Sequence, residues 1–414
     1  MRQRHVALRA MKRGISFDDS PSIDAFGHLR VSNPEAIMTV LCQYDKEPLT
    51  MESGATGSGI VPEHNTSTRM VRLRAAAGTG TSFMQSYTYW SYQPGRSQRV
   101  ELTGKFGAPV VGSNTEFGYF DADNGFIYRH QLEGVSFVLR SKTSGAVVDT
   151  VIPQVQWNLD TLDGQGPSGE ILDTSKVFIL TMDFEFLGMG RVRMGFNIGG
   201  SIIYAHEFLH SNVLNDSYMQ TATLPVQILL TTTASVAESE AHFKGALVMS
   251  EGGLLKELGY TFATPRHTVS AVNGIRTHLM TLRPKLLFNG LANRESYVTR
   301  SLDIFTKDKP VFWELVAGAN FSAAPTFTDV NPQFSGTEVG SGGTFSNLTG
   351  GVVLRSGFAV GSEATPVHVP LDLRHPLVLN RAGQHTSLGS LSLLVQGIDG
   401  AVDTHAAISF TELR

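Results

Sequence analysis

The sequence is poor in the features that mark several large classes of protein. It has a single cysteine, Cys42, among 414 residues, so no disulfide can form within one chain. No apolar run approaches the roughly 18 residues of a transmembrane helix, and the N-terminus lacks the apolar centre of a signal peptide. We therefore expect a protein without a membrane span that is assembled in the reducing cytoplasm and is not secreted by a signal-peptide route.

Helical patterns are also missing, and charge is sparse. Charged residues make up 17% of the chain, and no long segment repeats apolar residues at helical spacing. Short alternating segments follow one another instead, for example from Val100 to Phe106 and from Phe126 to His130. The length exceeds one ordinary domain. We predict an all-β fold of two β-sandwich, jelly-roll-like domains: an arm and docking linker at residues 1–34, a first sandwich at 35–255, and a linker with a second sandwich at 256–414.

The few charges are unevenly distributed, because residues 1–14 contain five basic residues and no acidic one. These are Arg2, Arg4, Arg9, Lys12 and Arg13. Removing five positive charges from the net charge of −4 leaves −9 for the remainder. A basic arm on an acidic body can contact a neighbouring protein, remain a solvated tail or bind nucleic acid. We favour the protein contact over nucleic acid, since five charges support only weak, salt-sensitive binding to phosphates.

The stretch from Lys176 to Ala205 predicts an antiparallel meander with one apolar face. A loop at residues 188–190 would pair Phe186 with Val192, Phe184 with Met194, Met182 with Phe196, Leu180 with Ile198, and Glu185 with Arg193. A turn at residues 199–200 would pair Phe196 with Ile203 and Met194 with Ala205. We expect the apolar side chains to line the first core and Asp183, Glu185, Arg193 and Asn197 to share the opposite face.

The string His206-Glu207-Phe208-Leu209-His210 matches a zinc-protease pattern, which requires a helix to bring both imidazoles to one ion. Here it follows a Gly-Gly turn, and a strand would separate the two histidines by about 13 Å at 3.3 Å per residue. Glu207 would also fall on the apolar face, so we expect the strand to end or bulge near His206. A structural role is favoured over a zinc hydrolase, in which Glu238 or Glu240 would be the third ligand.

Three other groups of residues allow both a structural and a functional interpretation. Residues 121–125 resemble the start of a calcium loop, but they lack the closing glutamate and predict a turn. Asp160 and Asp163, in the glycine-rich segment 157–169, could form a carboxylate pair for glycoside hydrolysis or belong to an assembly loop. Four aromatic residues predict sheet packing, with a sugar-binding platform as the alternative. They are Tyr87, Tyr89, Trp90 and Tyr92.

Several strings resemble a family of tailed-bacteriophage virion structural proteins. The resemblance covers most of residues 20–255 and rests on residues 20–32 (SPSIDAFGHLRVS), 92–95 (YQPG), 157–169 (WNLDTLDGQGPSG), 191–193 (RVR) and 250–253 (SEGG). It departs from the family pattern at His28, where arginine is expected. The resemblance implies a structural component present in several copies, without catalysis. With this family in view, Phe26, Leu29 and Arg30 join the basic residues as the expected assembly arm.

These observations lead to three hypotheses. The first is a virion structural protein of the tail, neck or head, anchored by its N-terminal arm, with other virion proteins and copies of itself as partners and with no cofactor or bound metal. The second is a carbohydrate-binding adhesin module of the tail that contacts a glycan of the host surface. The third is the zinc hydrolase. We expect no enzyme activity.

Overall fold

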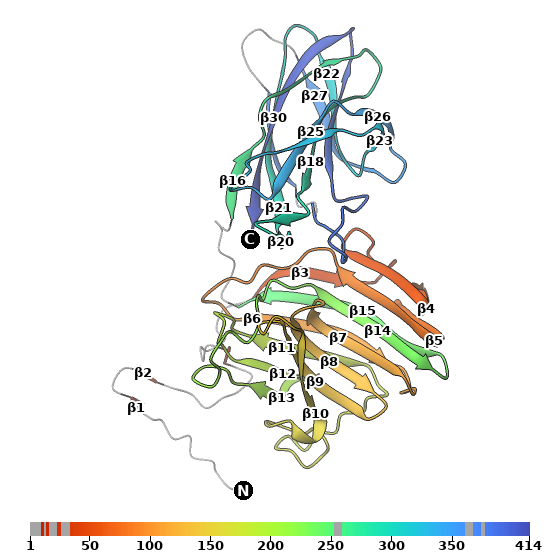
Figure 1. The fold of residues 1–414 in the computed structure, drawn as a ribbon, viewed down its shortest axis with the longest axis vertical. Coiled ribbons are helices and arrows are strands. Elements are labelled where there is room, and N and C mark those ends of the chain that lie inside the picture. Colours follow the sequence, from red (N-terminus) through yellow and green to blue (C-terminus); the bar gives the residue numbers. More distant parts are fainter. Residues whose placement is uncertain are drawn as a thin grey trace. The chain divides into compact units, whose positions relative to one another are not determined.

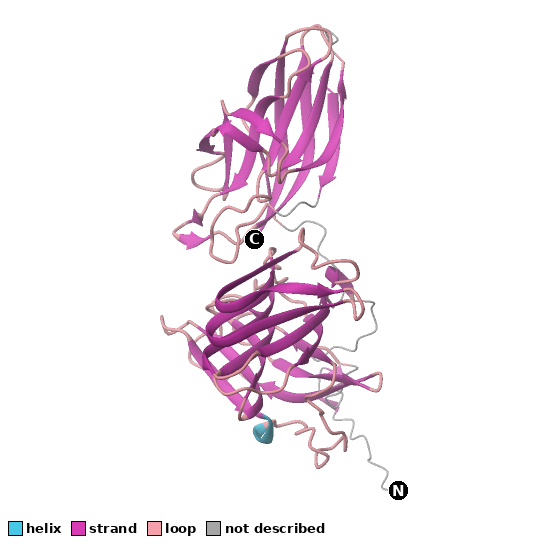
Figure 2. Ribbon diagram, turned by 90° about the vertical axis from the view of Figure 1, so that its right-hand side faces the viewer, coloured by secondary structure: helices cyan, strands magenta, loops and turns pink. Residues whose placement is uncertain are grey.

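The computed structural model describes residues 10–11, 14–15, 23–25, 34–251, 259–360, 367–373 and 377–414. It confirms the all-β prediction, with antiparallel sheets throughout (Figure 1). The one helical element described is a single 3-10 turn, η1 (Gln154–Gln156), and no helix in this part of the chain has the length and apolar content to span a bilayer (Figure 2).

The chain divides into two compact units. The first contains Met1–Ser86 and Tyr92–Lys256, and the second contains Glu257–Arg414 together with the short segment Tyr87–Ser91. The sequence-based division places residues 87–91 in the first domain, whereas their contacts group them with the second unit.

The first unit is built on a sheet of 13 strands with the order β10-β9-β8-β7-β14-β5-β15-β6-β11-β12-β13, in which β3 adds to β15 and β4 adds to β5. The strands are β3 (Glu35–Leu41), β4 (Met51–Asn65), β5 (Met70–Ser86), β6 (Gln98–Phe106), β7 (Ser113–Phe120), β8 (Gly125–Gln131), β9 (Gly134–Ser141), β10 (Val148–Pro153), β11 (Phe178–Phe184), β12 (Val192–Ile198), β13 (Ser201–Phe208), β14 (Val226–Ser235) and β15 (Ser239–Ser250). The pair β1 (Ala10–Met11) and β2 (Gly14–Ile15) is separate.

The large sheet curls so that its ends face each other around an aromatic core. Phe196 on β12 lies 4.9 Å from the ring of Tyr128 on β8 and 5.9 Å from Phe137 on β9, although these strands are far apart in the sheet order. Trp157 stacks on Phe137 at 4.3 Å. These side chains are almost completely buried, so the two halves of one sheet form the two layers of a sandwich.

The second unit is a sandwich of two sheets. One has the order β16-β30-β21-β28 with β17 on β30, and the other has the order β24-β25-β18-β29-β22-β27. The strands of the unit are β16 (Tyr260–Ala263), β17 (His267–Ala271), β18 (Thr277–Pro284), β19 (Leu287–Phe288), β20 (Leu291–Ala292), β21 (Ser296–Thr306), β22 (Val311–Ala317), β23 (Asn320–Ala323), β24 (Thr326–Asp329), β25 (Thr337–Ser341), β26 (Thr344–Asn347), β27 (Val352–Ala359), β28 (Val367–Leu373), β29 (Leu391–Gly397) and β30 (Val402–Leu413). Its core joins Ile408 and Phe410 of the first sheet to Trp313 and Leu393 of the second.

The meander forms, and its predicted apolar face is confirmed, since Met182, Phe184, Met194 and Phe196 are at most 1% exposed. The predicted register of its first hairpin is wrong by two residues: Phe184 faces Val192, and Asp183 faces Arg193. The reason is a longer loop. The N–H of Glu185 bonds to the carbonyl of Arg191, so Phe186 belongs to the turn and not to the strand.

A shift of two residues keeps every side chain on its predicted face, because the side-chain period of a strand is also two. In the second hairpin the prediction that Phe196 faces Ile203 is confirmed. A bulge then places His206, and not Ala205, opposite Met194. This confirms the expected bulge near His206.

Candidate functional site

The expected assembly arm lies outside the described residues. This applies to Arg2, Arg4, Arg9, Lys12, Arg13, Phe26, Leu29 and Arg30. Within the linker, Ile23, Asp24 and Ala25 are described and are buried on the first unit. The prediction that the linker docks is therefore confirmed for these three residues.

The zinc-protease string is not helical, because His206 and Glu207 lie on β13. Nδ1 of His206 accepts the N–H of Asn158 at 3.2 Å, and burial lowers the pKa of His206 to about 4. His210 donates from Nδ1 to the carbonyl of Gly190 at 2.7 Å and stacks on Tyr218 at 4.0 Å. No group of three metal-binding side chains occurs among the described residues. The structure thus gives both imidazoles packing roles.

Asp160 and Asp163 both accept hydrogen bonds from their own loop. The buried carboxylate of Asp160 accepts the N–H groups of Leu162 and Ser168 at 2.9 and 2.8 Å. Asp163 accepts the hydroxyl of Thr161 and the N–H of Gln165, and these bonds lower its pKa. These bonds support the alternative in which both residues order their own loop, and the glycoside-hydrolase interpretation stays a prediction.

The other two ambiguous groups are structural as well. Asp121 accepts the N–H groups of Asp123 and Asn124 at 2.8 Å, which confirms the turn. In the aromatic cluster, Tyr92 stacks on Phe184 at 5.9 Å and Tyr89 is 3% exposed. Sheet packing is thus confirmed for Tyr92, whereas the buried ring of Tyr89 lies under the guanidinium of Arg294.

A pocket that sequence reasoning missed lies on the face of β7, β8, β9 and β14 opposite the aromatic core. It has a volume of about 530 Å³. The lining residues are Val111, Gly112, Ser113, Asn114, Glu116, Arg129, Gln131, Leu132, Glu133, Arg140, Leu229, Thr231 and Thr233. Beside it on the same face, Phe120, Ile127, Val138 and Leu229 form a small buried cluster. The pocket therefore rests on a packed, rigid sheet.

Four charged residues form a network at this pocket. Arg129 donates from Nε to Glu116 at 2.8 Å and from Nη2 to Asp149 at 2.5 Å. Arg140 donates to both carboxylate oxygens of Asp149 at 2.8 and 3.0 Å. Burial alone would raise the pKa of Asp149, but the hydrogen bonds from both arginines hold it below its usual value. Two positive and two negative side chains thus balance each other.

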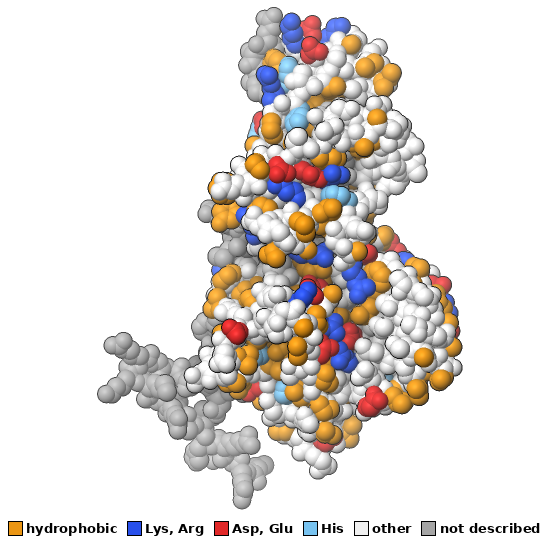
Figure 3. Space-filling model, viewed as in Figure 1, with side chains coloured by type: hydrophobic (Ala, Val, Ile, Leu, Met, Phe, Trp, Pro, Cys, Tyr) orange, Lys and Arg blue, Asp and Glu red, His pale blue; other side chains and the backbone are white. Residues whose placement is uncertain are grey.

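The network is built into neighbouring strands. Glu116 on β7 is paired in register with Arg129 on β8 and with Leu229 on β14, and Asp149 on β10 faces Arg140 on β9. Glu116 is 2% exposed and Arg129 is 8% exposed. On the face of the first unit shown in Figure 3, positive (blue) and negative (red) side chains occur in small mixed groups, and uncharged surface lies between these groups. A charged residue in an otherwise apolar strand is the sequence signal that could have found them.

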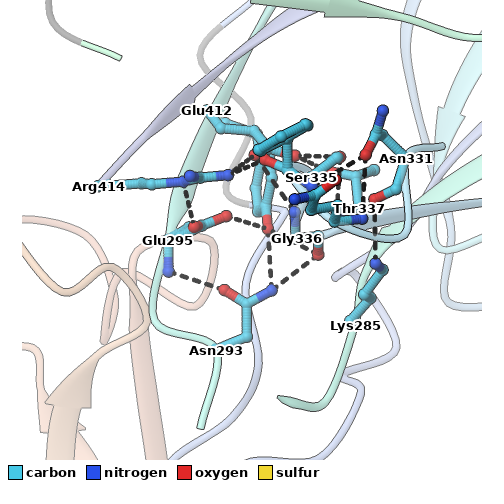
Figure 4. Close-up of polar contacts among 12 residues, drawn as sticks. Lys285, Asn293, Glu295, Asn331, Ser335, Gly336, Thr337, Glu412 and Arg414 are labelled. Carbon is cyan, nitrogen blue, oxygen red and sulfur yellow. Dashed lines mark hydrogen bonds and ion pairs between the residues drawn. The ribbon is translucent and has the colours of Figure 1, made fainter. Parts of the chain in front are cut away.

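A second polar cluster lies at the C-terminal end of the second unit (Figure 4). The fully buried carboxylate of Glu412 accepts the hydroxyls of Ser335 and Thr337 at 2.6 and 2.7 Å, and Nη2 of Arg414 at 2.8 Å. Arg414 also binds Glu295 through Nε at 2.5 Å. Two carboxylates thus share one guanidinium.

The sharing of one cation shifts the protonation of this cluster. Burial raises the pKa of Glu295 to about 7, and the nearby Glu412 adds to this effect while Arg414 opposes it. A β-carbon on Gly336 would lie 2.3 Å from Oε2 of Glu295, so the backbone closes tightly over the carboxylate. This cluster is enclosed and tied to a turn, whereas the pocket of the first unit is open to a ligand.

Comparisons with known proteins find likeness in fold alone. No family model matches the chain, and a search of curated proteins finds no match. A legume lectin-like domain from Entamoeba histolytica is 8% identical over 52% of this chain and 98% of its own, with a TM-score of 0.30. A carbohydrate esterase from the Shiga toxin-encoding bacteriophage phi24B is 10% identical over 53% of this chain and 100% of its own, with a TM-score of 0.31.

The botulinum neurotoxin serotype D binding domain is 11% identical over 66% of this chain and 75% of its own, with a TM-score of 0.32. TM-scores of 0.30 to 0.32 are too low for these likenesses to say what this chain binds or does.

Proposed function

We propose that the protein binds carbohydrate and that the pocket on β7, β8, β9 and β14 is the binding site. The observation that carries the proposal is a pocket of about 530 Å³ lined by hydrogen-bonding side chains on rigid strands. This volume lies within the roughly 300–1,000 Å³ typical of small-molecule sites. Because β-sheet pairing fixes the strands, these polar groups need little ordering when a ligand binds.

The chemistry of the lining suits sugar hydroxyls, each of which donates and accepts hydrogen bonds. The amide of Gln131 and the hydroxyl of Thr231 offer both functions, and Leu229 gives an apolar contact for the C–H face of a ring. The charged lining residues are Glu116, Arg129, Glu133 and Arg140, and Asp149 contacts both arginines from beside the pocket. Three carboxylates and two arginines leave one negative charge, which disfavours an anionic ligand. The proposed ligand is therefore a neutral sugar.

A glycan array probed with the purified full chain tests the proposal, followed by calorimetric titration of the glycan that binds best. The variant Gln131→Leu/Thr231→Val keeps side-chain size but removes two partly exposed hydrogen-bonding groups. We expect about a tenfold or greater loss of affinity, since each hydrogen bond contributes roughly 0.5–1.5 kcal/mol.

The matched control is Thr68→Val, in the exposed turn between β4 and β5, which should bind as the parent does. Equal affinities for the parent and the pocket variant would place the sugar elsewhere. An array without any signal would remove the proposal.

A second proposed role is that of a multi-copy structural component of a tailed-phage virion, assembled in the host cytoplasm. It is supported by the strings described above and by the burial of Ile23, Asp24 and Ala25 on the first unit. The two roles are compatible, since an adhesin of the tail is itself a virion component.

Deleting residues 1–14 tests the structural role, because it removes the five basic residues and keeps the docked segment. We expect an unchanged melting temperature and loss of the chain from purified particles, measured by quantitative mass spectrometry. Equal incorporation with and without the arm would show that the arm is not the anchor.

A further inference from the structure

The buried segment of residues 23–25 contacts Arg193 on β12 and Arg191 in the turn before that strand. We call the site formed by these two arginines and Asp183 the socket. Arg193 and Asp183, which face each other across β12 and β11, have fully buried side chains. The guanidinium of Arg193 donates to the two carboxylate oxygens of Asp183 at 2.9 and 2.8 Å and lies 4.2 Å over the ring of Tyr204. The same guanidinium donates to the carbonyl of Ile23 at 2.6 Å.

A second arginine continues this recognition along the segment. Arg191 donates from Nη2 to the carbonyl of Asp24 at 3.3 Å and approaches the carboxylate of Glu207 to 3.6 Å. The two arginines therefore bind consecutive main-chain carbonyls, while the side chains of Ile23 and Ala25 are buried beside them. The socket therefore fits a peptide segment that presents two consecutive carbonyl groups to the arginines and buries small apolar side chains beside them.

The socket needs an occupant. An ion pair with both side chains fully buried depends on complete hydrogen bonding and on exclusion of water. Withdrawal of the segment would remove an acceptor from Arg193 and the cover over it. The socket is thus a binding site in its own right, although the chain itself supplies the segment that fills it.

Nothing in these contacts requires the segment and the socket to belong to the same copy. Eight residues, 26–33, separate Ala25 from Pro34, and such a connection spans up to about 30 Å. The segment follows an arm that carries five basic residues, while the remainder of the chain has a formal charge of −9. This difference in charge favours contact between an arm and a body, either within one copy or between two copies.

From this geometry we infer that the socket of Arg191, Arg193 and Asp183 is a joint between copies, which takes residues 23–25 of a neighbouring chain in the assembled state. Exchange of an identical segment keeps every contact, so it links copies at little cost. The inference goes beyond the proposed virion role, on which it rests for the assembly, but its test uses isolated chains and does not depend on particles.

Two full-length variants separate the functions of segment and socket. The acceptor carries Ile23→Asp, which places a charge at a buried position of the segment and leaves the socket intact. The donor carries Asp183→Leu/Arg193→Met, which replaces both charges of the buried pair with apolar side chains and leaves the segment intact. Should the donor fail to fold, Arg191→Ala takes its place, because that side chain is partly exposed and its loss removes one carbonyl contact.

The first measurement is fluorescence anisotropy of a labelled peptide of residues 17–33 with the acceptor. We expect saturable binding that the same peptide carrying Ile23→Asp does not show. The second is native mass spectrometry of a mixture of donor and acceptor, for which we expect a 1:1 heterodimer that neither variant forms alone.

Absence of specific peptide binding would overturn the socket as a binding site. Peptide binding by the acceptor together with only monomers in the mixture would show that each copy fills its own socket, and would overturn the joint. Glycan binding by the acceptor should equal that of the parent, because the pocket lies on other strands. Failure of the joint is therefore distinguishable from failure of the proposed carbohydrate or virion function.

Discussion

The charged network at the pocket of the first unit and the carboxylate cluster of the second unit use the same residue types to different ends. The first has two arginines for two carboxylates and borders an open pocket. The second has Arg414 for Glu295 and Glu412, enclosed by the turn at residues 335–337. In the first unit the paired charges border a pocket that a ligand can enter. In the second unit one arginine serves two enclosed carboxylates, so the stability of the cluster depends on the protonation of one of them.

The largest effect that this comparison predicts is on the enclosed cluster. Glu412→Ala should lower the free energy of unfolding by about 3–5 kcal/mol, because it leaves the buried hydroxyls of Ser335 and Thr337 without their acceptor and removes one of the two carboxylates that Arg414 contacts. Denaturant melts of the full chain measure the change. Glu238→Ala is the control, since its side chain is 47% exposed and its pairing with Arg72 should contribute under about 1 kcal/mol. Equal losses would mean that enclosure does not distinguish the two settings.

A smaller effect on stability is expected at the open network. Arg140→Gln should cost about 1–2 kcal/mol, because Arg129 continues to hold Asp149 at 2.5 Å. It should also weaken glycan binding, since Arg140 lines the pocket. Parallel melts and calorimetric titrations separate the two effects. A loss as large as that of Glu412→Ala, with glycan binding intact, would make this network a structural cluster like the other.

The dependence on a proton gives the third prediction. Glu295 binds its proton more tightly in the folded chain than in the unfolded chain, because its pKa rises from 4.5 to about 7. Its contribution to stability is therefore greatest below pH 4.5 and is lost as the pH rises through 7. Buried His206 and His278, with pKa values lowered to about 4, act in the opposite direction by favouring stability above pH 6.5.

Glu295→Gln isolates the contribution of this carboxyl group, because the histidines are present in both proteins. The difference in melting temperature between parent and variant should shift in favour of the variant from pH 4.5 to pH 7, as measured by thermal melts at matched ionic strength. A constant difference across this range would show that Glu295 titrates normally.

The smallest effect is expected from salt on glycan binding. Because a neutral sugar carries no charge for salt to screen, affinity should change by less than about twofold between roughly 50 and 500 mM NaCl. Biolayer interferometry at several salt concentrations measures it. A tenfold fall would indicate that a charge of the pocket contacts an acidic sugar, and the ligand class would have to be revised.

Period-two patterns predicted the strands and faces of the meander, because burial of Met182 and Phe184 on one face dictates which side chains point inward. They could not predict that Asp183, and not Glu185, meets Arg193, since a register shifted by two residues leaves the faces unchanged. The length of the loop decides between these registers, and the hydrogen bond from Glu185 to Arg191 that closes it is not written in the alternation.

The pocket was beyond sequence reasoning for another reason. Glu116 and Thr231 line one cavity although they are more than a hundred residues apart, because β14 inserts between β7 and β5 in the sheet. The same holds for Glu295 and Glu412, which meet only after β21 pairs with β30. Local patterns show that such residues are unusual in a strand, but the order of the strands brings them together.

The single cysteine can report the rate at which part of the first unit opens. Cys42 follows β3, is fully buried, and donates its N–H to the carbonyl of Lys244 on β15. Burial first, and then the nearby Glu47, raises the pKa of its thiol to about 12. Since only the thiolate reacts, the folded chain should be nearly inert to thiol reagents at neutral pH. The rate of labelling in native buffer then reports how often β3 separates from β15 at this one position.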